Sequence, residues 1–339
     1  MALVVDAMGG DDAPRSPVRG ALQAAADVSG PIELVGLPTA IEPLLQGAAS
    51  GERIRVVAAT EQIGMDEHPV EAVRKKRDAS LVVAARRVKE LGAEGALVSA
   101  GSTGAVLAAS LLHIGRIPGV ERPAIAVVLP LFTGPVVLLD GGANVDCRPS
   151  HLVQFGVLGR VFARVVLGIP EARVGLLNIG EEETKGNELT IAVHPLMRRH
   201  VPGFVGNVEG KDVFSGACDV VVCDGFVGNV LLKSIEGFAA ALLGEIKRAA
   251  AASVRGKLGG WLLKGALSSL RARLDYRSYG GAFLIGVRGV VVVAHGRSDE
   301  VAMANAVRLA HRGVRGDLVA SIGEAIQRLP EEVSSHAGS

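Results

Sequence analysis

Glycines and polar residues gather in five short segments, each of which directly follows a run of aliphatic residues. The segments are residues 6–11 (DAMGGD), 99–105 (SAGSTGA), 140–147 (DGGANVDC), 178–186 (NIGEEETKG) and 224–229 (DGFVGN). In open α/β sheets, ligands bind in the loops beyond the carboxyl ends of the strands. Glycine lets the backbone approach a ligand closely, and the N–H groups at a helix start attract anions. The pattern therefore indicates a binding site for a small anion such as phosphate.

Lys185 has the most specific setting of the polar residues in these segments. It follows three consecutive glutamates (181–183) in a loop just after an aliphatic strand, and it precedes Gly186. A lysine in such a loop supplies positive charge for a bound phosphate, or a hydrogen-bond donor for a developing oxyanion. The alternative is a surface lysine that pairs with the neighbouring glutamates, an arrangement that contributes little to stability.

Ser102 and Thr103 stand at the start of a helix expected over residues 103–114. Asn229 stands near the head of a long helix expected from about Val227. At such positions, polar side chains and unpaired backbone N–H groups point toward an anion, which the helix dipole also attracts. The alternative is plain helix capping, which Ser, Thr and Asn all favour. Two such helix starts, each beside a glycine-rich loop, together favour an anion site.

Strand-end aspartates and a cysteine leave two other chemistries open. Asp140, Asp146 and Asp224 suit coordination of Mg²⁺, but loop aspartates commonly accept hydrogen bonds from backbone N–H groups, and we expect no metal. Cys147, with His151 four residues later, has the composition of a nucleophile and its base. A thiol buried at a strand end is more often inert.

The elements that must hold these loops alternate between short aliphatic strands and amphipathic helices. Strands are expected over residues 3–6, 32–36, 54–58, 96–99, 124–129, 136–140, 174–177 and 220–223, with a late pair at 282–286 and 289–294. Helices are expected over residues 15–26, 81–91, 103–114, 152–167, 187–199, 299–312 and 315–328. Strands that are apolar on both faces belong to a mostly parallel sheet under helices. We therefore predict an α/β protein with a three-layer αβα fold, formed as one unit by residues 1–329 with a frayed tail at 330–339. The alternative to one continuous unit with a cleft between two lobes is a pair of separable domains.

Composition and motifs exclude several common functions. In 339 residues, 36 Lys and Arg nearly balance 35 Asp and Glu, so no overall charge favours nucleic acid as a partner. None of the 44 glycines has another glycine two positions away, which removes the Rossmann fingerprint, and neither Gly-Lys pair belongs to a Walker loop. The chain also has no G-x-S-x-G elbow and no H-E-x-x-H motif.

Cysteine usage and the N-terminal sequence predict a cytoplasmic protein. The three cysteines lack the paired short spacings of a metal site, and MALVVDAMGGDD lacks the basic and apolar regions of a signal peptide. The uncharged stretches 95–115 and 123–139 are interrupted by polar residues or prolines, so we expect neither to span a membrane.

Nine segments, taken in order, resemble a known family, the bacterial phosphate acyltransferases, which convert acyl-acyl carrier protein and inorganic phosphate into acyl phosphate. The segments are DAMGGD (6–11), KKRDAS (75–80), SAGSTGA (99–105), DGGAN (140–144), NIGEEETKG (178–186), GNVEG (206–210), DGFVGN (224–229), LDYRSYGGA (274–282) and HGRS (295–298). The resemblance extends to about residue 325. It implies a two-lobed αβα homodimer with a cleft, similar to phosphotransacetylases and the isocitrate-dehydrogenase-like group, and we expect no cofactor.

Two positions depart from the family's pattern. Ala79 precedes Ser80 where the family usually has paired serines, which argues against a role for the first hydroxyl. Ser102 stands where the family usually has asparagine, and it keeps a hydrogen-bond donor and acceptor.

The resemblance implies attack of phosphate on a thioester, a reaction that needs positioning and electrostatic stabilisation more than acid–base chemistry. The expected catalytic residues are Lys185, Asn229, Ser102 and Thr103. The expected substrate- and phosphate-binding residues are Asp6, Gly9, Gly10, Gly104, Asp140, Asn144, Glu182, Asn207, Asp224 and His295. Among these, the aspartates are expected to hold loops in place, and His295 has the alternative of a core histidine.

The same resemblance implies a basic docking surface, because acyl carrier protein is acidic. Arg74, Lys75, Lys76 and Arg77 are expected to form its docking surface. The alternative is a solvated helix face. The docking hypothesis predicts a steep dependence of activity on salt.

Residues 247–273 contain seven basic residues and no acidic one, with leucines at helical spacing and a break at Gly259-Gly260. This pattern predicts an amphipathic helical hairpin at about 236–275 that binds an anionic membrane surface from the cytoplasmic side. The residues expected at the membrane are Leu258, Trp261, Leu262, Lys264, Leu267, Leu270 and Arg271. The alternative is a helix packed on a dimer partner, and the two are compatible.

Other functions stay open at this point. They are a phosphotransacetylase that uses acyl-CoA, a metal-dependent decarboxylating dehydrogenase of the same fold group, and a non-catalytic membrane scaffold of lipid synthesis. A downstream glycerol-3-phosphate acyltransferase is a further expected partner.

Overall fold

The computed structural model describes residues 1–47, 53–253, 255–259, 261–263, 265, 280–330 and 333. Within them lies one 11-stranded sheet with the order β3-β2-β1-β4-β11-β10-β5-β6-β9-β7-β8. Its strands are β1 (Ala2–Asp6), β2 (Ile32–Gly36), β3 (Ile54–Ala58), β4 (Gly95–Ser99), β5 (Ala124–Leu131), β6 (Gly134–Leu139), β7 (Val174–Leu177), β8 (Phe204–Val208), β9 (Val220–Val222), β10 (Ala282–Ile285) and β11 (Val290–Val293).

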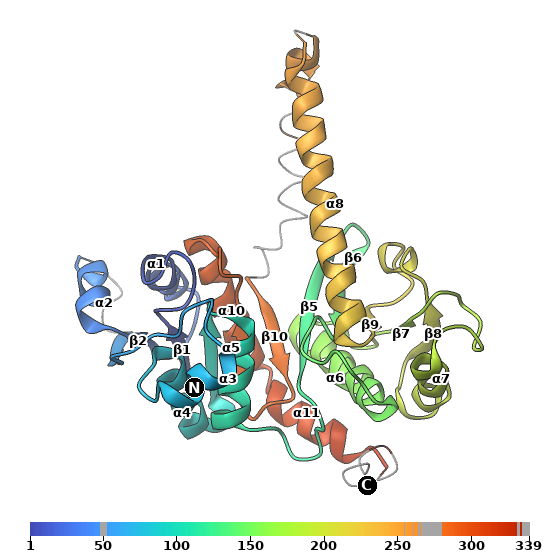
Figure 1. Ribbon diagram of the computed structural model, residues 1–339, viewed down its shortest axis with the longest axis horizontal. Coiled ribbons are helices and arrows are strands. Elements are labelled where there is room, and N and C mark those ends of the chain that lie inside the picture. Colours follow the sequence, from blue (N-terminus) through green and yellow to red (C-terminus); the bar gives the residue numbers. More distant parts are fainter. Residues whose placement is uncertain are drawn as a thin grey trace.

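Helices cover both faces of the sheet, which gives the expected three layers (Figure 1). They are α1 (Arg15–Ala24), α2 (Pro38–Leu45), α3 (Pro69–Lys75), α4 (Ser80–Leu91), α5 (Thr103–Ala109), α6 (Pro149–Leu167), α7 (Glu188–His200), α8 (Gly225–Ala251), α10 (Glu300–Arg315) and α11 (Leu318–Gln327). The buried side chains of α1, α6, α7, α10 and α11 share one core cluster. Those of α4 and α5 belong to a second cluster, on the opposite face.

The sheet consists of two parallel groups that run in opposite directions. The β1 group is β3, β2, β1, β4 and β11, and the β6 group is β6, β9, β7 and β8. Between them, β10 and β5 contribute three antiparallel pairings, β11 with β10, β10 with β5 and β5 with β6. Because each antiparallel pairing reverses the strand direction, three of them make the β6 group run opposite to the β1 group. The carboxyl ends of the two groups therefore point in opposite directions along the sheet.

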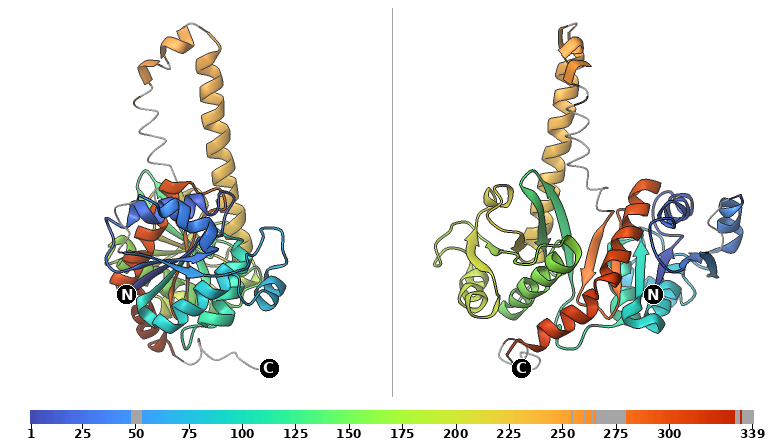
Figure 2. Two further views of the ribbon diagram at one scale, coloured as in Figure 1. Left: turned by 90° about the vertical axis from the view of Figure 1, so that its left-hand side faces the viewer. Right: turned by 180° about the vertical axis from the view of Figure 1, so that it is seen from behind.

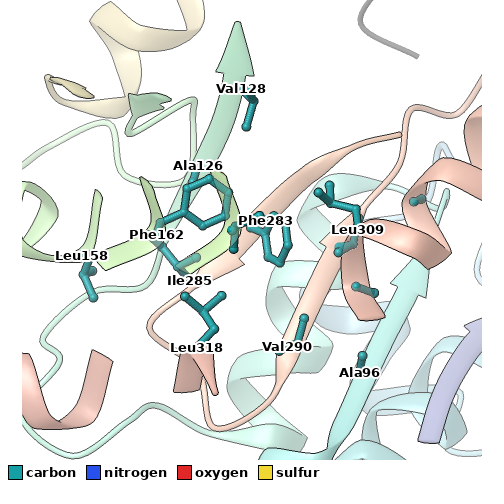
Figure 3. Close-up of a cluster of buried hydrophobic side chains, with 14 of the residues drawn as sticks. Ala96, Ala126, Val128, Leu158, Phe162, Phe283, Ile285, Val290, Leu309 and Leu318 are labelled. Atoms are coloured by element: carbon teal, nitrogen blue, oxygen red, sulfur yellow. The ribbon is translucent and has the colours of Figure 1, made fainter. Parts of the chain in front are cut away.

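One continuous hydrophobic core joins the two groups. Phe162 of α6 packs edge-on against Phe283 of β10, with ring centroids 4.9 Å apart (Figure 3). Leu309 of α10 lies beside Phe283 in this view and Leu318 of α11 lies near Ile285, and all four side chains belong to the same core cluster. Burial of large aromatic side chains contributes several kcal/mol each, roughly 3–5 by truncation to alanine. The central strands are therefore held as part of a single packed unit.

Helix α8 leaves the body of the protein and projects well beyond it (Figures 1 and 2). By length and composition, α6 and α8 are both apolar enough to span a bilayer. In α6, 72% of the 18-residue apolar stretch is buried in the core, whereas in α8 only 6% of the corresponding stretch is buried. The hairpin expected at about 236–275 overlaps helix α8, which begins earlier, at Gly225. Residues 255–259 and 261–263 are also helical, while Lys264, Leu267, Leu270 and Arg271 lie outside the described residues.

The mostly parallel sheet and every expected strand are confirmed, and three elements were not anticipated. Helix α2 contains Pro43, and α3 begins with Pro69, a residue that is tolerated in the first turn. Strand β8 has Gly206 at its centre, where a glycine normally argues against a strand interior. Pro43 and Gly206 oppose the elements in which they lie, so tertiary packing decides there, whereas Pro69 is compatible with the first turn of α3.

Candidate active site

The loops after β1, β4 and β11 meet at the carboxyl end of the β1 group. The backbone N–H of Asp11 donates to the carbonyl of Gly296 over 2.8 Å, and that of Ala294 donates to the carbonyl of Ser99 over 2.8 Å. Gly10 has φ +104°, and a Cβ there would lie 3.0 Å from Cβ of Ala100. The sequence thus needs glycine at this position, both for its backbone angle and for close contact between two loops. His295 is exposed beside them, and its Nδ1 accepts from the N–H of Arg297.

Asp6 lies fully inside this loop cluster. Its Oδ1 accepts from Ser80 Oγ at 2.6 Å and from the N–H of Met8 at 3.2 Å, while its Oδ2 accepts from Ser99 Oγ at 2.7 Å. Burial raises the pKa of the Asp6 carboxyl, and the two hydroxyls and the N–H partly oppose that shift. These bonds join Asp6 to its own loop, to the start of α4 and to the end of β4, so the carboxylate fixes the loop.

Ser102 and Thr103 begin α5 directly after these loops. Ser102 occupies the N-cap position, and among the described residues its side chain makes no capping hydrogen bond. Gly104 follows, where a Cβ would lie 2.8 Å from Cγ of Pro69 in α3. Simple capping therefore does not account for Ser102, whose hydroxyl is not used by the helix.

The loop after β6 is built around Asp140, which is completely buried. Its Oδ1 accepts from the N–H groups of Ile125, Gly142 and Ala143 at 3.0–3.1 Å. Its Oδ2 accepts from both the backbone N–H and the side-chain Nδ2 of Asn144, at 2.7 and 2.8 Å. The amide of Asn144 also donates to the carbonyl of Pro123. Asp140 and Asn144 are thus engaged in shaping the loop.

The first turn of α8 is locked onto that loop. Asp224 caps the helix by accepting from the N–H of Val227 at 2.9 Å, and the N–H of Gly225 donates to the carbonyl of Asn144 at 2.7 Å. A Cβ on Gly228 would overlap the carbonyl oxygen of Asp140. The Asn229 side chain lies 3.4–3.6 Å from the position of a Cβ on Gly142. Asn229 therefore faces the glycine-rich loop, as a site residue would.

Lys185 stands on a loop that two asparagines hold in shape. Asn178 Nδ2 donates to the carbonyl of Lys185 at 3.0 Å, and the buried Asn207 donates its Nδ2 to the carbonyl of Glu182 at 2.8 Å. Glu183 forms its ion pair with Arg198 of α7. The side chain of Lys185 is exposed, and within the part of the chain that the structure describes it makes no ion pair. The alternative of a lysine neutralised by its neighbouring glutamates is therefore not what the structure contains.

The register of the sheet brings the two loop groups to one level. Ser99 at the end of β4 pairs with Val293, and Val293 pairs with Ala282. Because Phe283 pairs with Ala126, Ala282 lies beside Val127, which pairs with Leu138 near the end of β6. Ser99 and Leu138 thus share a level, although their strands run in opposite directions. The loops that follow β4 and β6 consequently flank the same part of β10 and β5.

In Figure 1, β10 and β5 lie between α5 and α8, and we call the face of these two strands beneath the helices the floor of the candidate site. Val127 packs against the cluster under α4 and α5 and also against the cluster under Leu231 and Leu232 of α8, so both helices lie on this face. Val127 and Ala282 themselves are only half-buried, as is Ala143 of the loop after β6. The apolar floor and the polar loop after β6 therefore lie next to each other.

The thiol of Cys147 fits the role of a nucleophile poorly. Burial raises the pKa of Cys147 to about 12, with the charges of Asp140 and Asp224 adding to the effect, so the thiol stays protonated at neutral pH. His151 Nε2 faces Glu121, 3.1 Å away, instead of the thiol. Among the described residues, no group of three His, Cys, Asp or Glu is placed to hold a metal ion.

The remaining predicted residues lie outside this core. Arg74, Lys75 and Arg77 are exposed at the end of α3, while Lys76 is bound to Glu67 at 2.7 Å. At the far end of the projecting helix, Leu258, Trp261 and Leu262 are 60–70% exposed. Two contributors were missed in the sequence, the hydroxyls of Ser80 and Ser99, which both donate to Asp6. Their signal was their place in the KKRDAS and SAGSTGA segments.

Solved structures of other proteins define the fold class. The phosphotransacetylase from Streptococcus pyogenes matches with a TM-score of 0.59 at 16% identity, over 93% of this chain and 94% of its own. The branched-chain phosphotransacylase from Enterococcus faecalis V583 matches with a TM-score of 0.58 at 16% identity, over 93% and 99%. The chain thus has the αβα fold of the phosphotransacylases.

Sequence similarity narrows the class to one family. Residues 1–320 match the family described as "Fatty acid synthesis protein". The chain is 52% identical over 335 residues to the phosphate acyltransferase of Heliobacterium modesticaldum (strain ATCC 51547 / Ice1), covering 98% of this chain and all of the relative. It is 51% identical over 325 residues to that of Desulforamulus reducens, covering 96% and 97%. The chain belongs to the phosphate acyltransferase family of fatty acid and phospholipid synthesis, which confirms the resemblance found in its nine segments.

Proposed function

We propose that this phosphate acyltransferase takes a fatty acyl group from acyl-acyl carrier protein and transfers it to inorganic phosphate. The observation that carries the proposal is that two glycine-rich loop groups end at one level of the sheet, while Lys185 in the loop after β7 is exposed and makes no ion pair among the described residues. A phosphate oxygen attacks the thioester carbonyl carbon, the tetrahedral oxyanion collapses, and the carbon–sulfur bond breaks. The products are acyl phosphate and the carrier thiol, whose sulfur takes up a proton.

The place of each residue supports the role that we propose for it. Lys185 supplies charge to the phosphate or to the oxyanion, and Asn229, Ser102 and Thr103 supply hydrogen bonds. Asp6, Asp140 and Asp224 hold the loops in which these donors stand. Phosphate dianion is itself a competent nucleophile, so positioning accounts for most of the catalytic task.

An acyl group also needs apolar contacts. Large apolar side chains are exposed on three of the site loops: Val145 is 59%, Ile179 is 80% and Phe226 is 61% exposed. Together with the half-buried floor at Val127, they support a hydrophobic acyl group as the transferred unit. Activity that does not rise from short to long acyl donors would contradict this part of the proposal.

The donor and the reaction are tested in one assay. The purified full chain is incubated with acyl-acyl carrier protein, with and without phosphate, and both thioester loss and acyl phosphate are followed. We expect thioester loss that depends on phosphate. Thioester loss without phosphate contradicts the proposed reaction. A higher kcat/KM with acyl-CoA than with acyl-acyl carrier protein contradicts the proposed donor and favours the alternative of a phosphotransacetylase that uses acyl-CoA.

We further propose that the acidic carrier docks on the cluster Arg74–Arg77. Changing Arg74 and Arg77 to glutamate is expected to raise the KM for the carrier-bound donor by about tenfold and to flatten its dependence on salt, because rim charges steer association. Lys75 and Lys76 already pair with Glu71 and Glu67 and are left intact. As a control, the same reversals at the exposed Arg164 and Arg199 are expected to leave KM and its salt dependence unchanged. An unaltered salt dependence in the first variant rejects this docking surface.

Peripheral membrane attachment is proposed for the end of the projecting segment, on the cytoplasmic side. The exposed Leu258, Trp261 and Leu262 lie there beside the exposed Arg255. Apolar side chains next to basic ones are typical of helices that lie in an anionic membrane interface. We expect the full chain to float with liposomes that contain anionic lipid and not with neutral ones, and equal flotation on both would reject the charge-dependent attachment.

A homodimer is proposed on the exposed apolar side of α8. Phe238 is 71% and Leu242 48% exposed on this helix, and contiguous exposed apolar patches commonly mark interaction sites. A second copy of the chain would cover these side chains. Sedimentation equilibrium of the full chain is expected to give twice the monomer mass, and a monomer at micromolar concentration excludes the dimer.

A further inference from the structure

We infer that Ser80 is a positioning residue of the phosphate site, acting through Asp6 on the loops that follow β1 and β4. The inference rests on the proposed function, because it takes those two loops as the place where phosphate binds. Ser80 does not belong to any of the loops that follow the strands. It is the first residue of α4, and its own N–H is fixed by a bond of 3.0 Å to the carbonyl of Glu61.

Three buried side chains form one hydrogen-bonded chain. Ser80 Oγ donates to Asp6 Oδ1 at 2.6 Å, and Ser99 Oγ donates to Asp6 Oδ2 at 2.7 Å. Ser99 Oγ in turn accepts from the N–H of Gly101 at 3.1 Å. Ser80, Asp6 and Ser99 are each at most 2% exposed. Buried charged groups gain their stability from such bonds, and losing one of them leaves the charge unsatisfied.

The carboxylate sets the distance between the two loops. A Cβ on Gly9 would lie 2.7 Å from Asp6 Oδ2 and 2.8 Å from the backbone nitrogen of Gly101. The loop after β1 therefore touches the loop after β4 at the point where Asp6 and Ser99 meet. The N–H of Met8, one residue before Gly9, is bound by the other carboxylate oxygen. A rotation of the carboxylate would displace Met8 and Gly9 together.

Ser80 is the one side chain that holds Oδ1 among the described residues. Without its hydroxyl, Oδ1 retains the N–H of Met8 at 3.2 Å, a longer bond. The carboxylate is then free to turn toward another donor, and the loop turns with it. The neighbouring Ala79 is fully buried and apolar, so the first serine of the family's usual pair is not required for this contact.

The test compares two serines that are both buried. Ser80→Ala is expected to raise the KM for phosphate by about tenfold while kcat and the KM for the acyl donor change by less than about threefold, since one bond to a buried carboxylate is lost. Ser80→Cys, with a weaker donor of similar size, is expected to fall between the parent and Ser80→Ala. Ser110→Ala is the control, because the buried Ser110 hydroxyl has no hydrogen-bond partner among the described residues.

The outcomes separate positioning from plain stability. An unchanged phosphate KM in Ser80→Ala overturns the inference, and so does a fall in kcat alone that matches the loss of folded protein. If Ser80→Ala does not fold, Ser80→Cys and Ser99→Ala decide by the same split between the two KM values. A parent enzyme whose thioester loss ignores phosphate contradicts the proposed reaction itself, a result that is distinct from these.

Discussion

Replacement of Lys185 by alanine is expected to lower kcat/KM for acyl phosphate formation by about a hundredfold or more, the range found when one oxyanion or phosphate donor is removed from a preorganised site. The loop that carries Lys185 is held through its backbone by Asn178 and Asn207, so the variant should keep the loop's shape. The exposed side chain contributes little to folding, and the melting temperature should stay near that of the parent. Steady-state kinetics with phosphate and donor varied separately measures the effect.

A matched lysine tests whether the effect is specific. Lys211 lies in the next loop along the edge of the sheet and pairs with Glu209 at 2.9 Å. Lys211→Ala is expected to leave kcat/KM within about twofold of the parent, as for most surface ion pairs. Lys185→Arg keeps the charge but changes the donor geometry, and it should recover only part of the activity. Activity of Lys185→Ala within a few-fold of the parent would remove Lys185 from the mechanism.

The second large effect is expected for Gly228→Ala. The added Cβ overlaps the carbonyl oxygen of Asp140, which belongs to backbone and cannot move aside as a side chain would. The first turn of α8 must then shift away from the loop after β6, and Asn229 shifts with it. A displacement of about 1 Å at a reacting centre costs on the order of a hundredfold in rate. We expect such a loss in kcat, together with a lower melting temperature.

Another glycine of the same helix provides the control. Gly237 has nothing within 4 Å of the position of its Cβ. Gly237→Ala is expected to keep full activity and to stabilise the helix by up to about 1 kcal/mol, since alanine is the better helix former. Full activity in Gly228→Ala would show that contact between α8 and the loop after β6 does not position the site.

Much of the fold can be predicted from the sequence because its strands are short aliphatic runs separated by amphipathic helices. The loops were found for the same reason, since Asp6, Ser99, Asp140 and Asp224 each stand where such a run ends. Their hydrogen bonds could not be predicted, because each depends on partners that are distant in sequence. Ser80 and Asp6 are 74 residues apart, and only the packing of α4 against the sheet brings them together.

The orientation and the partners of individual side chains could not be predicted from the sequence either. Whether Lys185 pairs with the glutamates before it depends on where those carboxylates point, and Glu183 turns instead to Arg198 of α7. Whether Ser102 caps its helix depends on its side-chain orientation and not on its residue type. The opposed direction of the two strand groups rests on β10, whose partner β5 lies more than 150 residues earlier in the chain.

The pairing of β10 with β5 limits how this protein can vary in length. Three residue pairs join these strands, from Phe283 opposite Ala126 to Ile285 opposite Ala124. A slip of one residue would exchange the two faces and slide one loop group past the other by about 3.3 Å. Insertions and deletions should therefore be tolerated in the outer connections, which face solvent, and excluded from the strands in the middle. The two strands in the middle of the sheet are therefore the part whose length natural variation must leave unchanged.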